Sequence, residues 1–379
     1  MKIDLQRIPT DFQGERCFVH ARGAMDKEGR FLITTQPLRL SGSDIFYGMH
    51  TITSTDGGNS WSAITPSKTL VRMPHAAVPG WEVCLCDLTP MYHKKTGRFL
   101  ATGHTAIYEN DEFPAPPYER DTGWTVFDEQ TGDWRPLRFL GKPQGGDFYN
   151  CGSGCCQCVE LESGDVLVPV YFQDKKAAAD PWHSCSGVAV FRCAFDGEEL
   201  CFVEAGNTLS VQMPRGLGEP SVTAYGGAYY LCIRNDVTGY VSRSADGLHF
   251  APPQELCFDD GTNLGNYNTQ QHWITGGGKL WLVYTRRGAD NDHVFRHRAP
   301  LFIAEFDPDL MCVIRATERI VIPERGARLG NFGCFSVSDT ESYVVAAEWM
   351  QTTEPDWFNW RRCMEYGSGN SIFVAKITF

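Results

Sequence analysis

The charged side chains of this chain are densest between residues 286 and 298. This stretch contains Arg286, Arg287, Asp290, Asp292, His293, Arg296, His297 and Arg298. Arginines that converge on one cavity can bind a carboxylate through bidentate, charge-assisted hydrogen bonds. A long loop with this many charges is typical of the rim of a binding site. The alternative is a network of surface ion pairs, which would contribute little to stability. Two of its aspartates could also bind calcium, but we favour a site without a metal.

The cysteines offer a second possible chemistry. The chain has 15 of them, and the densest group is Cys151, Cys155, Cys156 and Cys158. Their spacing is not that of paired C-x-x-C zinc knuckles. We favour buried free thiols, because a free cysteine behaves as a small apolar residue. The first residues contain no apolar signal core, so we expect reduced thiols and a cytoplasmic location.

The overall charge limits the kinds of partner. The formal net charge is −12, which argues against a nucleic acid or an anionic membrane held by bulk electrostatics. The sequence also contains no run of about 18 apolar residues that could span a membrane. We therefore expect a small ligand, and an anionic one must be met by a local cluster of arginines. A second copy of the chain, in a homo-oligomer, is the other partner that we consider.

The elements that must position these residues are short strands. β-rich runs begin near residues 30, 98, 165, 228, 279 and 342, and all but the last follow a turn that contains glycine. Six repeats of a four-stranded unit predict an all-β fold, a six-bladed β-propeller of four-stranded antiparallel blades. We expect one domain over residues 1–379, with the run 371–377 paired with the N-terminal segment to close the ring. A β-sandwich or a seven-bladed ring is the alternative.

Two turn motifs support this architecture. Residues 54–61 read S-T-D-G-G-N-S-W, which matches the pattern S-x-D-x-G-x-x-W called an Asp box. A weaker copy lies at residues 244–250, one residue shorter and with Phe250 in place of tryptophan. In such a turn an Asx-type side chain caps the backbone, glycines supply positive φ, and an aromatic ring fills the space beneath. The motif closes a hairpin and carries no chemistry itself.

Asp boxes on a six-bladed propeller resemble the sialidase (neuraminidase) superfamily. The resemblance implies three arginines for the substrate carboxylate, an aspartate as general acid/base, and a Tyr–Glu pair as nucleophile and base. The implied activity is that of a glycoside hydrolase, without a cofactor, that removes a terminal acidic sugar such as sialic acid. The expected partner is therefore an acidic saccharide.

Blades one and four carry most of the implied site. In blade one, Arg22 matches the first arginine, and Asp44, ten residues before Ser54, matches the general acid/base. In blade four, Glu219 precedes a strand that ends at Arg234, and the weaker Asp box follows. This order is similar to the family's base followed by its second arginine.

Blade five offers the third arginine, and blade six departs from the family. Arg298 looks like the residue that begins the strand of the third arginine, and Arg287 and Arg296 of the charged loop are expected to bind substrate beside it. Where the family has its nucleophilic tyrosine, this chain has Asn331. A tyrosine from another position could replace it, and the candidates are Tyr267, Tyr284 and Tyr366.

The carboxylates Asp44 and Glu219 could act as acid and base on a glycosidic bond, with a rate contribution of about 10²–10⁴-fold. Without a placed tyrosine, direct attack by water with inversion is the expected course.

A polysaccharide lyase is the alternative, in which histidine and tyrosine abstract a proton from a uronic acid and arginine neutralises its carboxylate. The candidates for that chemistry are His50, His104, His272, His293 and Tyr267. The polar row 266–273, which includes Gln271 and His272, would contact the sugar. A third possibility is a non-catalytic, glycan-binding propeller, against which buried charge argues.

Overall fold

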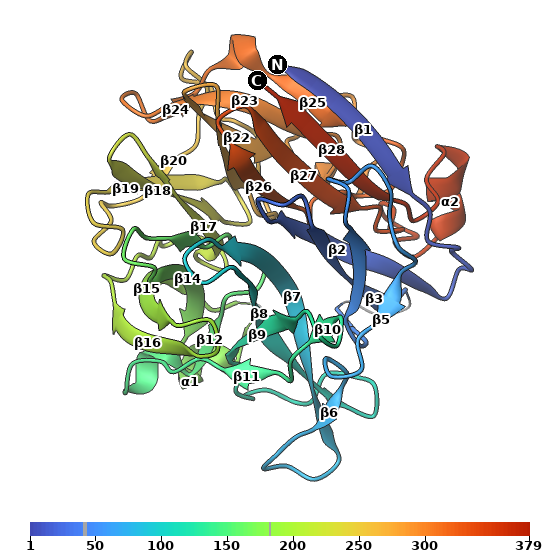
Figure 1. The fold of residues 1–379 in the computed structure, drawn as a ribbon, viewed down its shortest axis with the longest axis vertical. Helices are drawn as coiled ribbons and strands as arrows, with labels where there is room; N and C mark the ends of the chain where they lie inside the picture. The colour runs from blue at the N-terminus through green and yellow to red at the C-terminus, as the bar shows by residue number, and fades with distance from the viewer. Residues whose placement is uncertain (41–43, 182) are drawn as a thin grey trace.

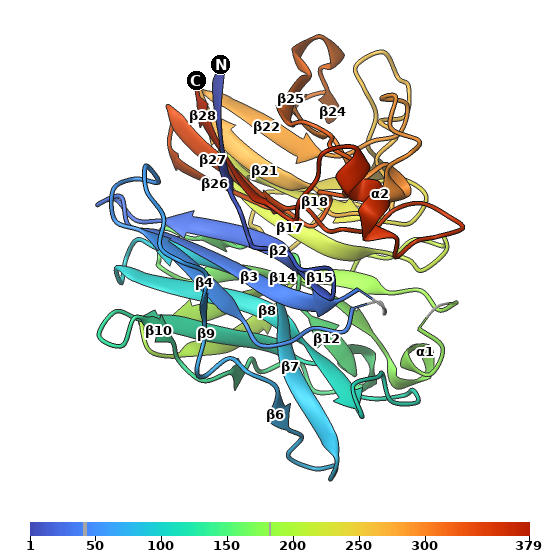
Figure 2. The ribbon, with the colours of Figure 1, turned by 90° about the vertical axis from the view of Figure 1, so that its right-hand side faces the viewer.

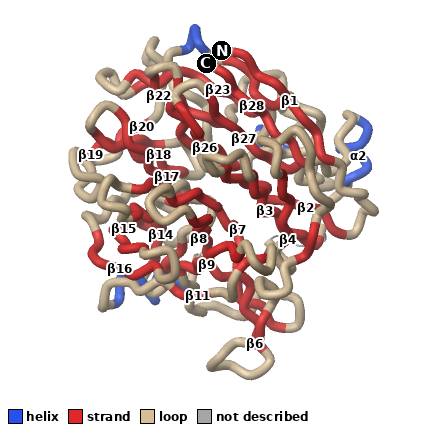
Figure 3. The backbone as a smooth tube through the Cα atoms, viewed as in Figure 1, coloured by secondary structure: helices blue, strands red, loops and turns tan. Residues whose placement is uncertain are grey.

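The computed structural model describes residues 1–40, 44–181 and 183–379. It is an all-β, six-bladed β-propeller, as the repeats predict (Figure 1). Each blade is an antiparallel sheet of four main strands, and short extra strands extend blades two, three and five. Strands and loops make up nearly all of the chain (Figure 3), and the short helices α1 and α2 lie at the same face of the ring (Figure 2).

The strands follow one another blade by blade. Blade one contains β2 (Arg16–Met25), β3 (Phe31–Arg39), β4 (His50–Ser54) and β5 (Thr65–Pro66). Blade two contains β6 (Met73–Pro74), β7 (Trp81–His93), β8 (Arg98–Glu109), β9 (Thr122–Asp128), β10 (Asp133–Trp134) and β11 (Arg138–Phe139). Blade three contains β12 (Asn150–Gly152), β13 (Val159–Glu160), β14 (Val166–Gln173), β15 (Gly187–Phe195) and β16 (Leu200–Ala205).

The second half of the ring continues in the same order. Blade four contains β17 (Gly218–Tyr225), β18 (Ala228–Arg234), β19 (Tyr240–Ser244) and β20 (Gln254–Glu255). Blade five contains β21 (His272–Gly276), β22 (Lys279–Tyr284), β23 (Leu301–Asp307), β24 (Cys312–Val313) and β25 (Arg319–Ile322). Blade six contains β26 (Gly333–Ser338), β27 (Glu341–Ala347), β28 (Ile372–Thr378) and the N-terminal strand β1 (Lys2–Ile8). The helical segments are η1 (Gly146–Phe148), α1 (Lys175–Ala178), η2 (Phe295–His297), η3 (Arg315–Thr317) and α2 (Trp360–Glu365).

The ring is closed by the two ends of the chain. β1 pairs antiparallel with β28, from Lys2 opposite Thr378 to Ile8 opposite Ile372. The pairing of the last strand with the N-terminal segment is thereby confirmed. The termini lie side by side in Figure 1 and Figure 2. The six repeated runs of the sequence are the second strands of the blades, namely β3, β8, β14, β18, β22 and β27.

The hydrophobic core lies between the blades. Between blades six and one, for example, Phe31 and Ile33 of β3 pack with Val345 of β27 and Val374 of β28, all of them buried. Similar clusters lie between the other pairs of neighbouring blades. Each blade therefore buries apolar side chains on both faces, which explains the continuous apolar runs in the sequence.

The innermost strands share a distortion near the propeller axis. In five of the six blades a non-glycine residue adopts left-handed φ at or beside the inner strand. These residues are His20 (φ 56°), Asp87 (φ 55°), Cys155 (φ 60°), Glu219 (φ 43°) and Asn268 (φ 54°). In β2, β7 and β17 the residue lies at a shift of strand register. Each such conformation costs about 1–3 kcal/mol, and such strain is typical of functional sites.

The Ser54–Trp61 turn is closed by side-chain hydrogen bonds. Ser54 Oγ donates to Asp56 Oδ1 (2.7 Å) and accepts from the backbone N–H of Gly58 (2.9 Å). Trp61 packs on the edge of Phe31, with ring centroids 5.0 Å apart. In the second turn, Ser244 Oγ donates to Asp246 (2.8 Å) and accepts from Gly247 (3.0 Å).

These two buried serines should support stability to a similar extent. We expect Ser54→Ala and Ser244→Ala each to lower the free energy of unfolding by about 1–2 kcal/mol, because a buried N–H loses its acceptor. Urea denaturation measures the change. Thr131→Ala is the matched control, since its hydroxyl is exposed and makes one long bond of 3.4 Å, and it should change stability by less than about 0.5 kcal/mol. Equal effects of Ser54→Ala and Thr131→Ala would contradict this account of the turn.

Candidate functional site

The floor of the site is built around the buried carboxylate of Asp87. His20 Nδ1 lies against Asp87 Oδ1, and Cys155 donates its thiol proton to the same oxygen over 2.9 Å. Arg22 Nη2 and His104 Nδ1 lie 3.5 and 3.7 Å from the carboxylate. Burial alone would raise the pKa of Asp87, but His20, with His104 and Arg22, holds it well below its usual range.

Arg22 lies beneath this floor and is completely buried. Its Nε donates to the carbonyl of Phe332 (3.2 Å), and its Nη2 donates to Cys155 Sγ (2.9 Å). The third nitrogen, Nη1, is buried without a hydrogen-bond partner in the described structure. Arg22 therefore ties blade one to blades three and six at the axis.

Three arginines meet above the floor on a single neutral oxygen. Asn268 Oδ1 accepts hydrogen bonds from Arg234 Nη2 (2.8 Å), Arg296 Nη1 (3.0 Å) and Arg298 Nη2 (3.1 Å). Arg298 Nη1 also donates to Asn331 Oδ1 (3.1 Å). The residue at the position where the resemblance implies a tyrosine thus holds an arginine in place.

A fourth arginine, Arg328, completes this cationic group. Its guanidinium lies 3.2 Å from the centre of the Trp349 ring and 4.8 Å from that of Phe295. Among the described residues, neither Arg328 nor Arg298 forms an ion pair with a carboxylate, and the Nε of each is buried without a partner. We call Arg234, Arg296, Arg298 and Arg328 the arginine cluster.

The electrostatics of the arginine cluster favour an anion. Burial, together with Arg234 and Arg296, lowers the pKa of Arg298 to about 9. Burial and Arg298 lower the pKa of Arg328 well below its usual value. Buried cations that repel one another are costly unless they are paired, so a bound carboxylate would stabilise this arrangement.

Asp44 and Glu219 both lie near the arginine cluster. The carboxylate of Asp44 is close enough to act electrostatically on Arg296, Arg298 and Arg328; residues 41–43 before it are outside the described residues. Glu219 Oε1 forms an ion pair with Arg234, and its Oε2 is buried without a partner. The sequence-predicted residues Asp44, Glu219, Arg234, Arg296, Arg298 and Asn331 are therefore brought together.

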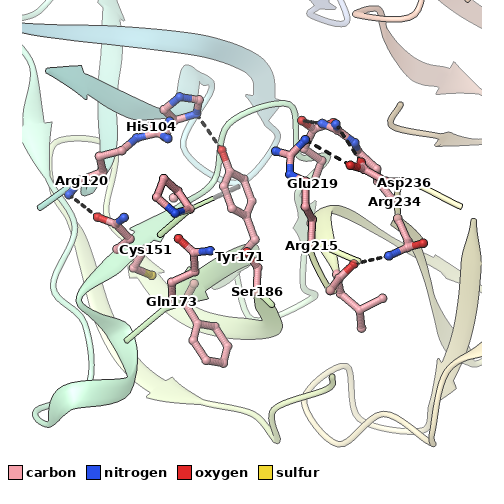
Figure 4. Close-up of a pocket in the computed structure, with 18 residues that line it drawn as sticks. His104, Arg120, Cys151, Tyr171, Gln173, Ser186, Arg215, Glu219, Arg234 and Asp236 are labelled. Atoms are coloured by element: carbon pink, nitrogen blue, oxygen red, sulfur yellow. Dashed lines mark hydrogen bonds and ion pairs between the residues drawn. The ribbon is translucent and has the colours of Figure 1, made fainter. Parts of the chain in front are cut away.

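A cavity opens beside the arginine cluster, between blades two, three and four (Figure 4). Its volume is about 740 Å³, including the part open to solvent. Glu219, Arg234, Arg215 and Asp236 line one wall. His104, Tyr171 and Arg120 line the other.

Two tyrosine–histidine pairs belong to this region. In the cavity, the hydroxyl of Tyr171 lies 2.9 Å from His104 Nδ1. On the rim, the hydroxyl of Tyr267 lies 2.6 Å from His297 Nδ1, and His297 Nε2 lies 3.0 Å from Asp292. Arg287 stacks 4.3 Å over the Tyr267 ring. Burial raises the pKa of Tyr267, and Arg287 and Arg298 oppose that effect.

The structure places the other predicted residues elsewhere. His50 packs on Phe18 in blade one (ring centroids 5.1 Å apart). His293 Nε2 lies 2.9 Å from Glu324 Oε1, and the imidazole stacks on Tyr366. Gln271 and His272 are buried at the axis. His272 is held by Ser221 Oγ (2.8 Å) and the carbonyl of Phe332 (3.0 Å).

Several residues of the site were not singled out from the sequence. They are Asp87, Arg120, Tyr171, Asn268 and Arg328. A usable signal existed for two of them: Asn268 belongs to the polar row 266–273, and Asp87 interrupts the apolar run 83–88. Tyr171 and Arg120 carry no such signal, because a tyrosine near a strand end and an arginine after prolines are ordinary surface features.

The cysteines and possible metal ligands can now be placed. All 15 cysteines are free thiols, and those of the 151–158 group are buried or half-buried. Burial raises the pKa of the Cys155 thiol well above its usual value, so it remains protonated and donates to Asp87. Within the described ranges, no group of three or more metal-ligating side chains occurs. Nor does any described helix have the length and apolar character to cross a bilayer.

The fold has been seen before in proteins of very different sequence. No protein family model and no curated protein sequence matches the chain. A protein of unknown function from Dyadobacter fermentans is similar over 99% of both chains, with 12% identity and a TM-score of 0.62. The Hadza microbial sialidase Hz136 shares 11% identity over 96% of this chain and 66% of its own, also with a TM-score of 0.62.

A sialidase from Trypanosoma rangeli, solved with the inhibitor DANA, is also similar to this chain in fold. It shares 13% identity over 98% of this chain, with a TM-score of 0.62. This chain spans 59% of the length of that protein. At such low identities the similarity establishes a sialidase-like propeller fold, and the chemistry must be argued from the site.

The buried histidines predict how stability depends on pH. Burial lowers the pKa of His104 and of His272 from an ordinary value of 6.5 to about 3. Between these values the unfolded chain binds protons that the folded chain does not. The free energy of unfolding should therefore fall as the pH drops from 6.5 toward 3, by up to about 1.4 kcal/mol per pH unit for each histidine.

Urea denaturation at pH 7.0 and at pH 4.5 would measure this fall. His272→Gln should make it smaller, whereas His183→Gln should leave it unchanged because that side chain is 82% exposed. A fall of the same size in the wild type and in His272→Gln would rule out the part assigned to His272.

Proposed function

We propose that this protein is a glycoside hydrolase of the sialidase-like type, which acts on a terminal acidic sugar. The arginine cluster binds the sugar carboxylate, and Asp44 and Glu219 lie at the reacting end. The observation that carries the proposal is the convergence of Arg234, Arg296 and Arg298 on the neutral oxygen of Asn268.

A carboxylate suits this cluster better than a neutral group. It can accept bidentate, charge-assisted hydrogen bonds from guanidinium groups, and its charge would offset the repulsion within the cluster. The Nε atoms of Arg298 and Arg328 are unused donors. In a protein of net charge −12, such a local cationic group also attracts small anions.

Asp44 and Glu219 supply carboxylates for acid–base work on a glycosidic bond. Glu219 forms an ion pair with Arg234, and we assign the general acid to Asp44. The strained backbone at both residues, with φ of 58° and 43°, is consistent with a functional role.

The substrate class is proposed from two further features. The turns at residues 54–61 and 244–250 resemble Asp boxes. The trypanosomal relatives by fold include a sialidase solved in complex with sialic acid. We therefore propose sialic acid, or a related sugar acid, as the first substrate to test.

Arg298 gives the most direct test. We expect Arg298→Ala to lower kcat/KM on 4-methylumbelliferyl N-acetyl-α-neuraminide by at least about 30-fold, because loss of one buried partner of a charged hydrogen bond costs 2–5 kcal/mol. Release of methylumbelliferone, followed by fluorescence, is the measurement. Arg243→Ala is the control, since Arg243 lies on the third strand of blade four and stacks on Tyr230.

The same assay distinguishes the alternative functions. Methylumbelliferyl glucuronide and glucoside compare an acidic with a neutral sugar, and an oligomeric uronate detects a lyase through the ultraviolet absorbance of an unsaturated product. Turnover of the neutral sugar alone, or an Arg298→Ala variant as active as the wild type, would contradict the proposal. Binding of sialic acid in calorimetry without any turnover would indicate a glycan-binding propeller.

A further inference from the structure

Arg120 brings a separate positive charge into the cavity, on the wall opposite Arg234 (Figure 4). It lies in the segment between β8 and β9, and its side chain is half-buried. Its Nε donates to the carbonyl of Thr105 (3.0 Å) in blade two, and its backbone N–H donates to Asn150 Oδ1 (2.9 Å) in blade three. Contacts with two blades therefore hold the guanidinium in place before a ligand binds.

The acidic neighbours of Arg120 in the sequence do not compensate its charge. Glu119 and Asp121 both form ion pairs with Lys142 instead (2.7 and 2.8 Å). After burial, the strongest influence on the pKa of Arg120 is the phenol of Tyr171, which is uncharged near pH 7. Arg120 itself forms no ion pair with a carboxylate in the described part of the chain. A half-buried cation without a counter-ion is costly, so this position favours an anion.

The unused donors of Arg120 face the cavity. Neither Nη atom donates a hydrogen bond to a described residue, and neither is enclosed by protein, in contrast to Nη1 of Arg22. Because Arg120 lines the cavity, its planar fork can make two parallel hydrogen bonds to a ligand there. A small oxyanion matches that geometry best.

The charges that line the cavity do not cancel. Three arginines line it, Arg120, Arg215 and Arg234, against two carboxylates, Glu219 and Asp236. Both carboxylates are on the wall of Arg234: Glu219 forms an ion pair with it, and Asp236 lies 3.4 Å from Arg234 and 3.2 Å from Arg215. The excess positive charge is therefore at Arg120, on the wall that carries no lining carboxylate to repel an anion.

The remaining side chains near Arg120 suit a sugar. The hydroxyl of Tyr171 and the amides of Asn150 and Gln173 line the same cavity, and such uncharged polar groups orient a ligand by hydrogen bonds. Tyr171 lies between the two walls, within electrostatic range of Arg120 and of Glu219 (Figure 4). One saccharide can therefore reach from the arginine cluster to Arg120.

We propose that this cavity is a second anion-binding subsite, in which Arg120 binds a second acidic group of the saccharide whose first carboxylate the arginine cluster holds. The inference rests on the hydrolase function proposed above and adds a substrate class, a saccharide with two negative charges. The second charge is either the carboxylate of a second sugar acid or a sulfate ester, because both present oxygens to a guanidinium fork.

Two matched pairs of substrates test the subsite on the full-length protein. The first pair is a dimer of sialic acid and the same dimer with its second carboxylate as the methyl ester. The second pair is sialyllactose with and without a sulfate ester on its galactose. Chromatography of the released sialic acid gives kcat/KM. We expect the wild type to favour the doubly charged member of at least one pair by about 10- to 100-fold, the usual contribution of a hydrogen bond to a charged group.

Three variants locate the preference. Arg120→Met removes the charge with little change in volume and should abolish the preference, while kcat/KM on sialyllactose changes by less than about threefold; this second value also shows that the variant is folded. Arg120→Lys keeps the charge without the fork and should retain part of the preference. Arg138→Met is the control and should retain all of it, because Arg138 is exposed on β11 of the same blade and forms an ion pair with Glu199.

Each outcome decides between the sources or against the inference. A preference within the first pair alone identifies a sugar carboxylate, and one within the second pair alone identifies a sulfate ester. Equal turnover within both pairs by the wild type, or a preference that persists in Arg120→Met, would overturn the subsite and leave the hydrolase function standing.

Calorimetry separates this inference from the proposed function. Binding of a doubly charged saccharide that is weakened in Arg120→Met but is accompanied by no turnover would overturn the hydrolase function and support the subsite. A wild-type protein that neither binds nor turns over any of the four saccharides would overturn both.

Discussion

The site depends on one buried carboxylate, that of Asp87. It lies between His20 and Arg22 of blade one, His104 of blade two and Cys155 of blade three. These contacts fix three inner strands against one another at the axis. Without this negative charge, the completely buried Arg22 would lose the carboxylate that lies 3.5 Å from its guanidinium, and an uncompensated cation is strongly unfavourable in a protein interior. The positions of His104 and of the cavity wall follow from this contact.

At the arginine cluster the buried charge has the opposite sign, because it is carried by arginines rather than by a carboxylate. Arg298 and Arg328 are buried and form no ion pair with a carboxylate among the described residues, and five residues at or beside the inner strands hold a left-handed backbone. Both features cost free energy, and neither is required to close a propeller. The packing between blades is extensive enough to hold them in place. Backbone strain and buried positive charge near this site are the features on which our proposal of an anionic ligand rests.

Much of the fold followed from local patterns. The six repeated runs are the second strands of the blades, because a strand between two others alternates its contacts with both neighbouring blades and must be apolar on both faces. Part of the site followed as well, since Asp44, Glu219, Arg234 and Arg298 lie at fixed places relative to the hairpins. Their roles remain proposals. Tyr171 and Arg120 could not be predicted, because their environment is created by segments far away in the chain.

The sequence by itself determined the architecture: hydrophobic runs at regular spacing, separated by glycine turns, allow few folds other than a ring of small sheets. It also supplied the charged residues near the axis. Only the tertiary structure decided which of them meet. In the folded protein Asn331 accepts a hydrogen bond from Arg298, and Tyr171 lies within hydrogen-bond distance of His104. Arg22 is buried and links blade one to blades three and six. The physical reason is that strand register and blade angle set these distances, and both arise from packing between blades rather than from any local segment.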